Sequence, residues 1–194
     1  AYLGIWVISP KRLFTNNWQD ELWLVAGGIF GGSLYFFTEN TALGITQASN
    51  VSFIICTAPL LTTILSLLFY KSEKASKGLI YGSLLALMGV GLIVFNGSFV
   101  LKISPIGDLL TLLAALSWAF YSLIIKKMAG RYPTIFITRK IFFYGVLTIL
   151  PAFLLHPLHP DTVVLLQPAV LFNLLFLAVL ASLICYVLWN VVLK

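Results

Sequence analysis

The stretch from Ser49 to Phe69 constrains the fold most, because it contains no charged residue. At about 1.5 Å per residue, a helix of this length crosses a hydrocarbon core of roughly 30 Å. Small and hydroxyl residues recur at steps of three and four, which places them on one helix face: Ser49, Ser52, Cys56, Pro59, Thr63 and Ser66. Lipid does not favour burial of such a face. The stretch therefore predicts one membrane-spanning helix with a polar inner face.

The composition extends this prediction to the whole chain. Of 194 residues, 60% are hydrophobic and only 9% are charged, whereas about a quarter of a soluble domain is charged. We therefore expect an all-α, polytopic transmembrane helical bundle. Both cysteines lie in apolar runs and are expected to be free thiols. The basic residues form no patch long enough for nucleic acid, so nucleic-acid binding is not expected.

Alternating apolar runs and polar loops predict six complete spans and one partial span, near residues 1–9 (partial), 22–43, 49–69, 78–95, 106–125, 132–155 and 168–194. In this arrangement Lys102 lies on one side of the membrane and the other eleven of the 12 lysines and arginines lie on the opposite side. The basic-rich side is predicted to be cytoplasmic.

An internal repeat is indicated at an offset of 150 residues, where residues 27–43 align with residues 177–193. Small residues align with small residues, and Asn40 aligns with Asn190. The predicted topology makes these two helices run in opposite directions. Inverted repeats of this kind are typical of transporters, whose substrate site lies near the repeat interface. A chance similarity between two apolar helices is the alternative.

Several stretches together resemble the EamA-type transporters of the drug/metabolite transporter (DMT) superfamily. They are TALGITQASNVSFIICTAPLLTTILSLLF, Glu73 in the following loop, KGLIYGSLLALMGVGLIVFNG, SPIGDLLTLLAALSWAFYSLIIKKM, and Arg139 at the cytoplasmic mouth of the next helix. The order and spacing of these stretches carry the resemblance, since no single motif among them is specific.

The resemblance implies a ten-helix exporter of the bacterial inner membrane, built from two inverted five-helix repeats around a central cavity. Residues 1–97 would be the C-terminal part of the first repeat, with part of helix 2 and helices 3–5. Residues 104–194 would be the N-terminal part of the second repeat, with helices 6–8. The family's first helix, most of its second, and its ninth and tenth are not represented, so a longer parent protein is expected.

Glu39 is the only acid well inside a predicted span, and an intramembrane carboxylate is by default a functional candidate. It would suit cation capture or proton coupling, and contact with interfacial water is the alternative. Other residues predicted to line a substrate cavity are polar or aromatic, with helix packing as their alternative role: Asn40, Asn50, Thr57, Trp118, Tyr121, Tyr186, Trp189 and Asn190.

Five residues are predicted to act as helix hinges or packing points: Gly28, Gly32, Pro59, Gly82 and Gly89. Arg139 is predicted to close a cytoplasmic gate, although topology signalling alone would explain it. His156 and His159 have a ligand-like spacing, but Pro157 and Pro160 interrupt the helix that would align them. We therefore expect neither a metal site nor a cofactor.

These features predict a secondary transporter that exports small metabolites by alternating access. Amino acids or related zwitterionic and amphipathic compounds are the expected substrates, and proton coupling is an option. The chain would act in the lipid bilayer as a monomer or homodimer. The main alternative is a non-transporting membrane scaffold or receptor. An intramembrane enzyme is disfavoured, because no pair of nucleophile and base is recognised within the spans.

Overall fold

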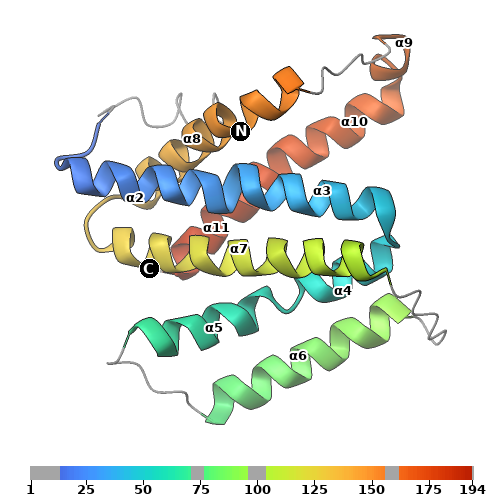
Figure 1. Cartoon of the computed structure of the whole chain (residues 1–194). Coiled ribbons are helices and arrows are strands. Elements are labelled where there is room, and N and C mark those ends of the chain that lie inside the picture. The colour runs from blue at the N-terminus through green and yellow to red at the C-terminus, as the bar shows by residue number, and fades with distance from the viewer. Residues whose placement is uncertain (1–13, 71–76, 96–103, 156–161, 194) are drawn as a thin grey trace. The chain divides into compact units, whose positions relative to one another are not determined.

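The computed structural model describes residues 14–70, 77–95, 104–155 and 162–193, and every regular element in these ranges is a helix (Figure 1). The elements are α2 (Trp18–Gly28), η1 (Ile29–Leu34), α3 (Tyr35–Ile45), α4 (Ala48–Ile55), α5 (Ala58–Phe69), α6 (Lys77–Phe95), α7 (Pro105–Ala129), α8 (Thr134–Leu155), α9 (Thr162–Leu165), α10 (Pro168–Phe176), η2 (Leu177–Ile184) and α11 (Cys185–Val192). The partial span predicted at residues 1–9 lies outside the described ranges.

The helices follow the predicted spans, and the all-α class is confirmed. The segments α2, η1 and α3 continue into one another from Trp18 to Ile45, and α10, η2 and α11 do so from Pro168 to Val192. Four segments of the described chain are long and apolar enough to cross a membrane: Ala48–Phe69, Pro105–Ala129, Thr134–Ala152 and Pro168–Val192. Each of the four lies within about one turn of a predicted span.

Residues 49–69 lie within one segment that is long and apolar enough to cross a membrane, but the helix is interrupted, since α4 ends at Ile55 and α5 begins at Ala58. We call this interruption the α4–α5 corner. Pro59 has no backbone N–H to donate to the carbonyl of Ile55, so a regular helix cannot pass through this point. Thr57 covers the break by donating its backbone N–H and its hydroxyl to the carbonyl of Ile54, over 2.9 and 2.6 Å.

The corner also divides the stripe of small residues that was predicted to face inward. Ser66 is buried and Ser49 and Thr63 are half-buried, but Ser52, Cys56 and Pro59 are exposed in this chain. A continuous helix would keep positions three and four residues apart on one face, and the turn at the corner removes that register. The predicted common inner face is therefore corrected to separate faces of α4 and α5.

The chain forms two compact units. The first contains residues 1–32 and 124–194, and the second contains residues 33–123. The division follows packing in space. The two predicted repeats, residues 1–97 and 104–194, were defined by similarity along the sequence and not by packing. They stay a prediction.

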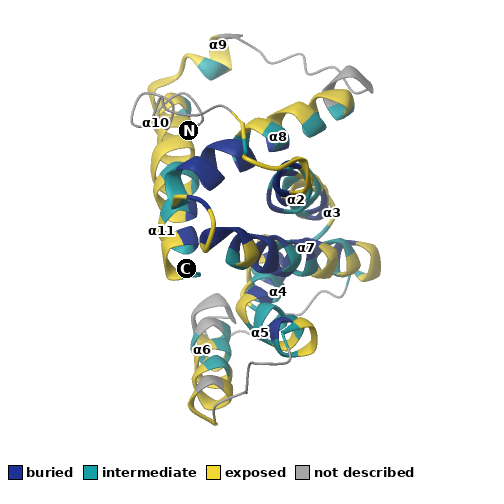
Figure 2. Cartoon of the chain, turned by 90° about the vertical axis from the view of Figure 1, so that its left-hand side faces the viewer, coloured by how far each residue is buried: buried dark blue, intermediate teal, exposed yellow. Residues whose placement is uncertain are grey.

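In the first unit, α2 packs along the N-terminal half of α8. Buried residues concentrate on that half of α8, as Figure 2 shows. Leu24, Ile137 and Ile141 are almost fully buried. The α10–η2–α11 rod contacts α8 through α11 and runs in the opposite direction to α2 (Figure 1).

In the second unit, α4 contacts both α3 and α6. The core is made largely of small residues, which allow close approach of helix backbones. Ala42, Val51 and Ala58 are buried on the α3 to α5 segments, and Ala114, Ala115 and Ala119 are buried on α7. Most described side chains of α6 are exposed (Figure 2).

Candidate functional site

An acid and three aromatic rings come together in the second unit, from α3 and α7. We call Tyr35, Glu39, Trp118 and Tyr121 the aromatic–acid group. Tyr35 lies one helical turn before Glu39 and donates its hydroxyl to Glu39 Oε1 over 3.1 Å. The ring centroids of Tyr35 and Trp118 are 5.0 Å apart, and those of Trp118 and Tyr121 are 5.1 Å apart.

The burial within the aromatic–acid group is graded. Tyr121 is fully buried, whereas Tyr35, Glu39 and Trp118 are half-buried. Tyr121 therefore supports Trp118 from the core, and the other three members keep part of their surface exposed. A carboxylate has about four lone-pair sites, so the bond from Tyr35 leaves acceptor capacity on Glu39. The arrangement suits a cationic group held by one carboxylate beside aromatic faces.

The other three polar candidates of this unit are not members of the aromatic–acid group. Asn40 is exposed and donates its side-chain amide to the carbonyl of Phe36 on its own helix, over 2.7 Å. Thr57 uses its hydroxyl at the α4–α5 corner. Asn50 is buried near the start of α4. Their predicted contact with substrate stays a prediction.

In the first unit, two candidates make buried hydrogen bonds between helices. Tyr186 of α11 donates its hydroxyl to the carbonyl of Gly31 in η1 over 2.5 Å, and its ring centroid lies 5.0 Å from that of Phe142. Asn190 is 1% exposed and donates its amide to the Thr138 hydroxyl on α8 over 2.8 Å. Trp189 is half-buried. For Tyr186 and Asn190 the observed contacts are helix-to-helix bonds.

The two π-helical segments occupy matching positions in the predicted repeat. Shifted by 150 residues, η1 (Ile29–Leu34) falls on residues 179–184, which lie within η2 (Leu177–Ile184). The π-helix accounts for well under 1% of residues in proteins and often marks functional sites. The repeat itself stays a prediction.

The glycine candidates differ in what surrounds them. A Cβ on Gly28 would lie 2.9 Å from the backbone nitrogen of Gly145, and one on Gly32 would lie 2.8 Å from the Gly145 Cα. These two glycines therefore let η1 and the end of α2 approach the α8 backbone closely. Gly82 and Gly89 have no heavy atom within 4 Å of such a Cβ in the described chain. For that pair, the predicted hinge or packing role stays a prediction.

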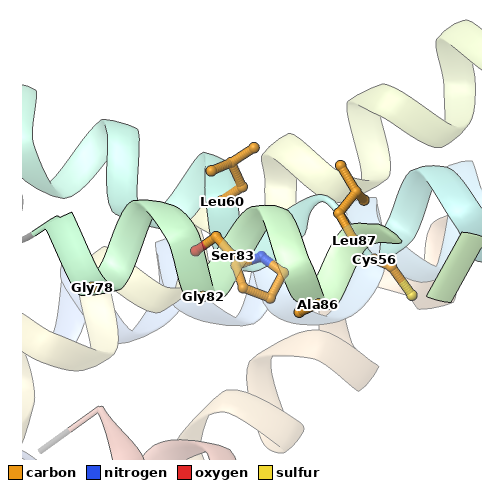
Figure 3. Close-up of a pocket in the computed structure, with 8 residues that line it drawn as sticks. Cys56, Leu60, Gly78, Gly82, Ser83, Ala86 and Leu87 are labelled. Atoms are coloured by element: carbon orange, nitrogen blue, oxygen red, sulfur yellow. The ribbon is translucent and has the colours of Figure 1, made fainter. Parts of the chain in front are cut away.

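Pro59 and Gly82 instead line a hollow of about 300 Å³ in the second unit (Figure 3). Its walls come from the α4–α5 corner and α6: Cys56, Pro59, Leu60, Gly78, Gly82, Ser83, Ala86 and Leu87. The lining is mostly apolar. The hollow agrees with the open space beside Gly82.

Sequence reasoning missed two acids at the start of α2. Asp20 accepts hydrogen bonds from Arg131 over 2.6 Å and from the Tyr132 hydroxyl over 2.9 Å. Glu21 Oε1 pairs with Lys140 Nζ at 2.5 Å and also accepts a bond from Tyr144. Asp20 and Glu21 are 5% and 7% exposed. The available signal was the adjacent acid pair before an apolar run, on the side predicted to carry most basic residues.

The electrostatics of Glu21 follow from these contacts. Glu21 precedes the apolar run that begins at Leu22. Burial alone would raise its pKa, but hydrogen bonds from Lys140, Tyr144 and Thr15 outweigh burial and lower the pKa from 4.5 to about 2. The carboxylate is therefore ionised at neutral pH. Arg139 is buried, with its guanidinium carbon 5.4 Å from the Phe136 ring centroid, and its gate role stays a prediction.

Within the described ranges, no group of three or more His, Cys, Asp and Glu side chains is placed to hold a metal ion. His156 and His159 lie outside those ranges.

Apolar spans joined by short polar segments, with a carboxylate among aromatic rings inside one unit, define a polytopic helical membrane protein. The family model described as "EamA-like transporter family" matches residues 1–95 and 105–194. The chain belongs to the EamA-like transporter family.

Two relatives and one solved structure are similar to this chain. A protein of Archaeoglobus fulgidus named "Uncharacterized transporter" is 28% identical over 96% of this chain and 64% of its own length. The protein of Bacillus subtilis (strain 168) named "Uncharacterized transporter YdfC" is 35% identical over 54% of this chain and 34% of its own length. One crystal structure matches with a TM-score of 0.70 at 20% identity, over 89% of this chain and 58% of that chain, which shows the shared fold. The chain spans less than two thirds of each of these proteins.

Proposed function

We propose that the protein containing this chain is a secondary transporter that exports small molecules bearing a cationic amine, such as amino acids or related zwitterionic and amphipathic metabolites. The observation that carries the proposal is the aromatic–acid group. Family membership supports transport, and the hydrogen bond from Tyr35 to Glu39 beside Trp118 supports the chemistry of the substrate.

The argument rests on the cost of a carboxylate among apolar helices. An intramembrane acid is rarely retained unless it faces protein or water, and such acids commonly mark substrate or ion pathways. A substrate ammonium would form a charge-assisted hydrogen bond to Glu39 and lie against the face of Trp118. A proton could take its place on Glu39 in the empty carrier, which would couple export to proton entry.

Alternating access between two inverted repeats is the proposed mechanism. The paired π-helical segments and the opposite directions of α2 and the α10–η2–α11 rod support it. Export and residence in a bacterial inner membrane rest on the resemblance and on the distribution of basic residues.

The test is efflux of a panel of radiolabelled amino acids and simple amines from proteoliposomes holding the complete protein. We expect saturable efflux of at least one amine. Glu39→Gln should lower its initial rate roughly 10- to 100-fold, because a hydrogen bond to a charged group contributes about 1.5–3 kcal/mol. Trp118→Phe should lower it roughly two- to fivefold.

The matched control is Thr41→Val on the same helix. Thr41 is exposed and donates its hydroxyl to the carbonyl of Phe37. This variant should keep the wild-type rate. Absence of saturable flux for the whole panel would reject the proposal in favour of a non-transporting scaffold.

A further inference from the structure

A charged cluster joins α2 to α8 and to the segment that precedes α8, all within the first unit. We call it the end lock. It consists of two acids from the start of α2 and four residues from the other segment: Asp20, Glu21, Arg131, Tyr132, Lys140 and Tyr144. The proposed function does not use these residues.

The inner half of the end lock is a buried ion pair. The side chains of Lys140 and Glu21 are 7% and 9% exposed, and their charged atoms are 2.5 Å apart. Thr15 adds bonds from its backbone N–H and hydroxyl to Glu21 Oε2, over 3.1 and 2.7 Å. The outer half, Asp20 with Arg131, is more exposed to solvent, since the Arg131 side chain is 55% exposed while that of Asp20 is 6% exposed.

The pairing crosses the predicted repeat boundary. Both acids belong to the first predicted repeat, residues 1–97, and all four of their partners belong to the second, residues 104–194. A rocking motion of one repeat against the other would have to separate Glu21 from Lys140. The end lock lies on the side where the sequence predicts eleven of the 12 basic residues.

A close backbone crossing lies farther along the same helix pair. Gly28 and Gly32 approach Gly145 so closely that a Cβ on either would meet the α8 backbone. Bulk cannot be added there, so the backbones of α2 and α8 stay close at this crossing. Tyr144 of the end lock adjoins the crossing, since a Cβ on Gly28 would also meet the Tyr144 Cβ. Glu21 lies about two turns before Gly28, and its ion pair with Lys140 is where separation of the two helices requires water to enter.

We propose that the end lock is a gate of the transport pathway at the basic-rich side, and that Glu21, Lys140 and Tyr144 hold it closed in this structure. In calling the opening a step of transport, the inference rests on the proposed function. Opening exchanges the buried ion pair for two hydrated charges. Loss of one partner therefore favours the open state, because it leaves the other charge buried and unpaired.

We do not expect protonation of Glu21 to open this gate. The groups facing Glu21 are Lys140 and Tyr144 of α8 and Thr15 of the preceding segment, and Asp20 with Arg131 and Tyr132 lies beside them. The lowered pKa of Glu21 keeps its carboxylate ionised at any pH a cell meets. A conformational change must therefore supply the opening.

The experiment uses the complete protein with Cys56→Ser and Cys185→Ser and a reporter cysteine at Leu24, one turn beyond Glu21 and 0% exposed. A membrane-impermeant maleimide applied from the basic-rich side should label Leu24→Cys slowly. In Glu21→Gln the labelling rate should rise about tenfold or more. The charge swap Glu21→Lys with Lys140→Glu should return the rate toward the starting value.

Lys127→Gln is the matched control. Its ammonium lies 3.6 Å from the Trp23 ring centroid and outside the end lock, so the labelling rate should not change. An unchanged rate in a monodisperse Glu21→Gln protein would overturn the proposal. If that variant does not fold, Tyr144→Phe removes one bond and keeps both charges. Its rate should rise roughly threefold, and no rise would overturn the proposal.

Labelling needs no substrate, so the two proposals fail separately. Labelling as expected without flux for any amine would support opening at the end lock and reject the proposed amine transport. Flux that depends on Glu39, with labelling unaffected by Glu21→Gln, would do the reverse.

Discussion

The acids of this chain show how a membrane helix bundle accommodates charge at the level of single residues. Glu21 pairs with Lys140, Asp20 pairs with Arg131, and Glu39 accepts from Tyr35. Asp108 accepts from the backbone N–H of Ser104, just before the first residue of α7. Each of these four described carboxylates thus has a donor from its own helix or from a neighbouring segment, as the high cost of a buried unpaired charge requires.

The lowered pKa of Glu21 predicts a pH dependence of stability. Because the folded-state value of about 2 lies below the ordinary value of 4.5, the contribution of Glu21 is fully present above about pH 4.5. It should be lost as the pH falls toward about 2. Thermal unfolding in detergent should therefore show a fall in Tm across this window that is smaller in Glu21→Gln. An equal fall in both proteins would contradict the assignment.

At the level of elements, the sequence predicted most of what hydropathy controls. Each of the six apolar runs predicted as a complete span contains helix in the structure, and the run at residues 49–69 is divided next to Pro59, which the sequence offered as a hinge or packing point. The π-helical segments have no comparable signal, since they depend on how the backbone settles against its neighbours. The partners of Asp20 and Glu21 on α8 and the segment before it are more than 100 residues away, and spacing along the chain does not indicate such pairs.

The crossing of α2 and α8 predicts unequal effects of two glycine substitutions. Gly28→Ala places a methyl group 2.9 Å from the Gly145 backbone and should destabilise the protein by about 1–3 kcal/mol. Gly82→Ala meets no atom within 4 Å inside α6 and should stabilise it by about 0.5–1 kcal/mol. Unfolding midpoints in one detergent compare the two. A stabilising Gly28→Ala would show that the helices do not touch there.

For the whole molecule, the chain represents less than two thirds of the length of the relatives described above. The order of the motifs predicted the family, and the composition and the apolar runs predicted the helical class. The family match is consistent with both predictions. The cavity residues divide between the two compact units, with the aromatic–acid group in one and Tyr186 and Asn190 in the other. Sequence alone offered them as one set, because polarity within apolar runs does not tell which helix each residue contacts.

The most direct measurement compares efflux of an amine with efflux of its N-acetylated analogue from proteoliposomes of the complete protein. The two compounds share the carbon skeleton of the amine, and the analogue adds one small acetyl group, but only the free amine carries the cation that Glu39 would bind. We expect the free amine to leave at least roughly tenfold faster, and Glu39→Gln to remove the difference. Equal rates for both compounds in the wild-type protein would contradict the account.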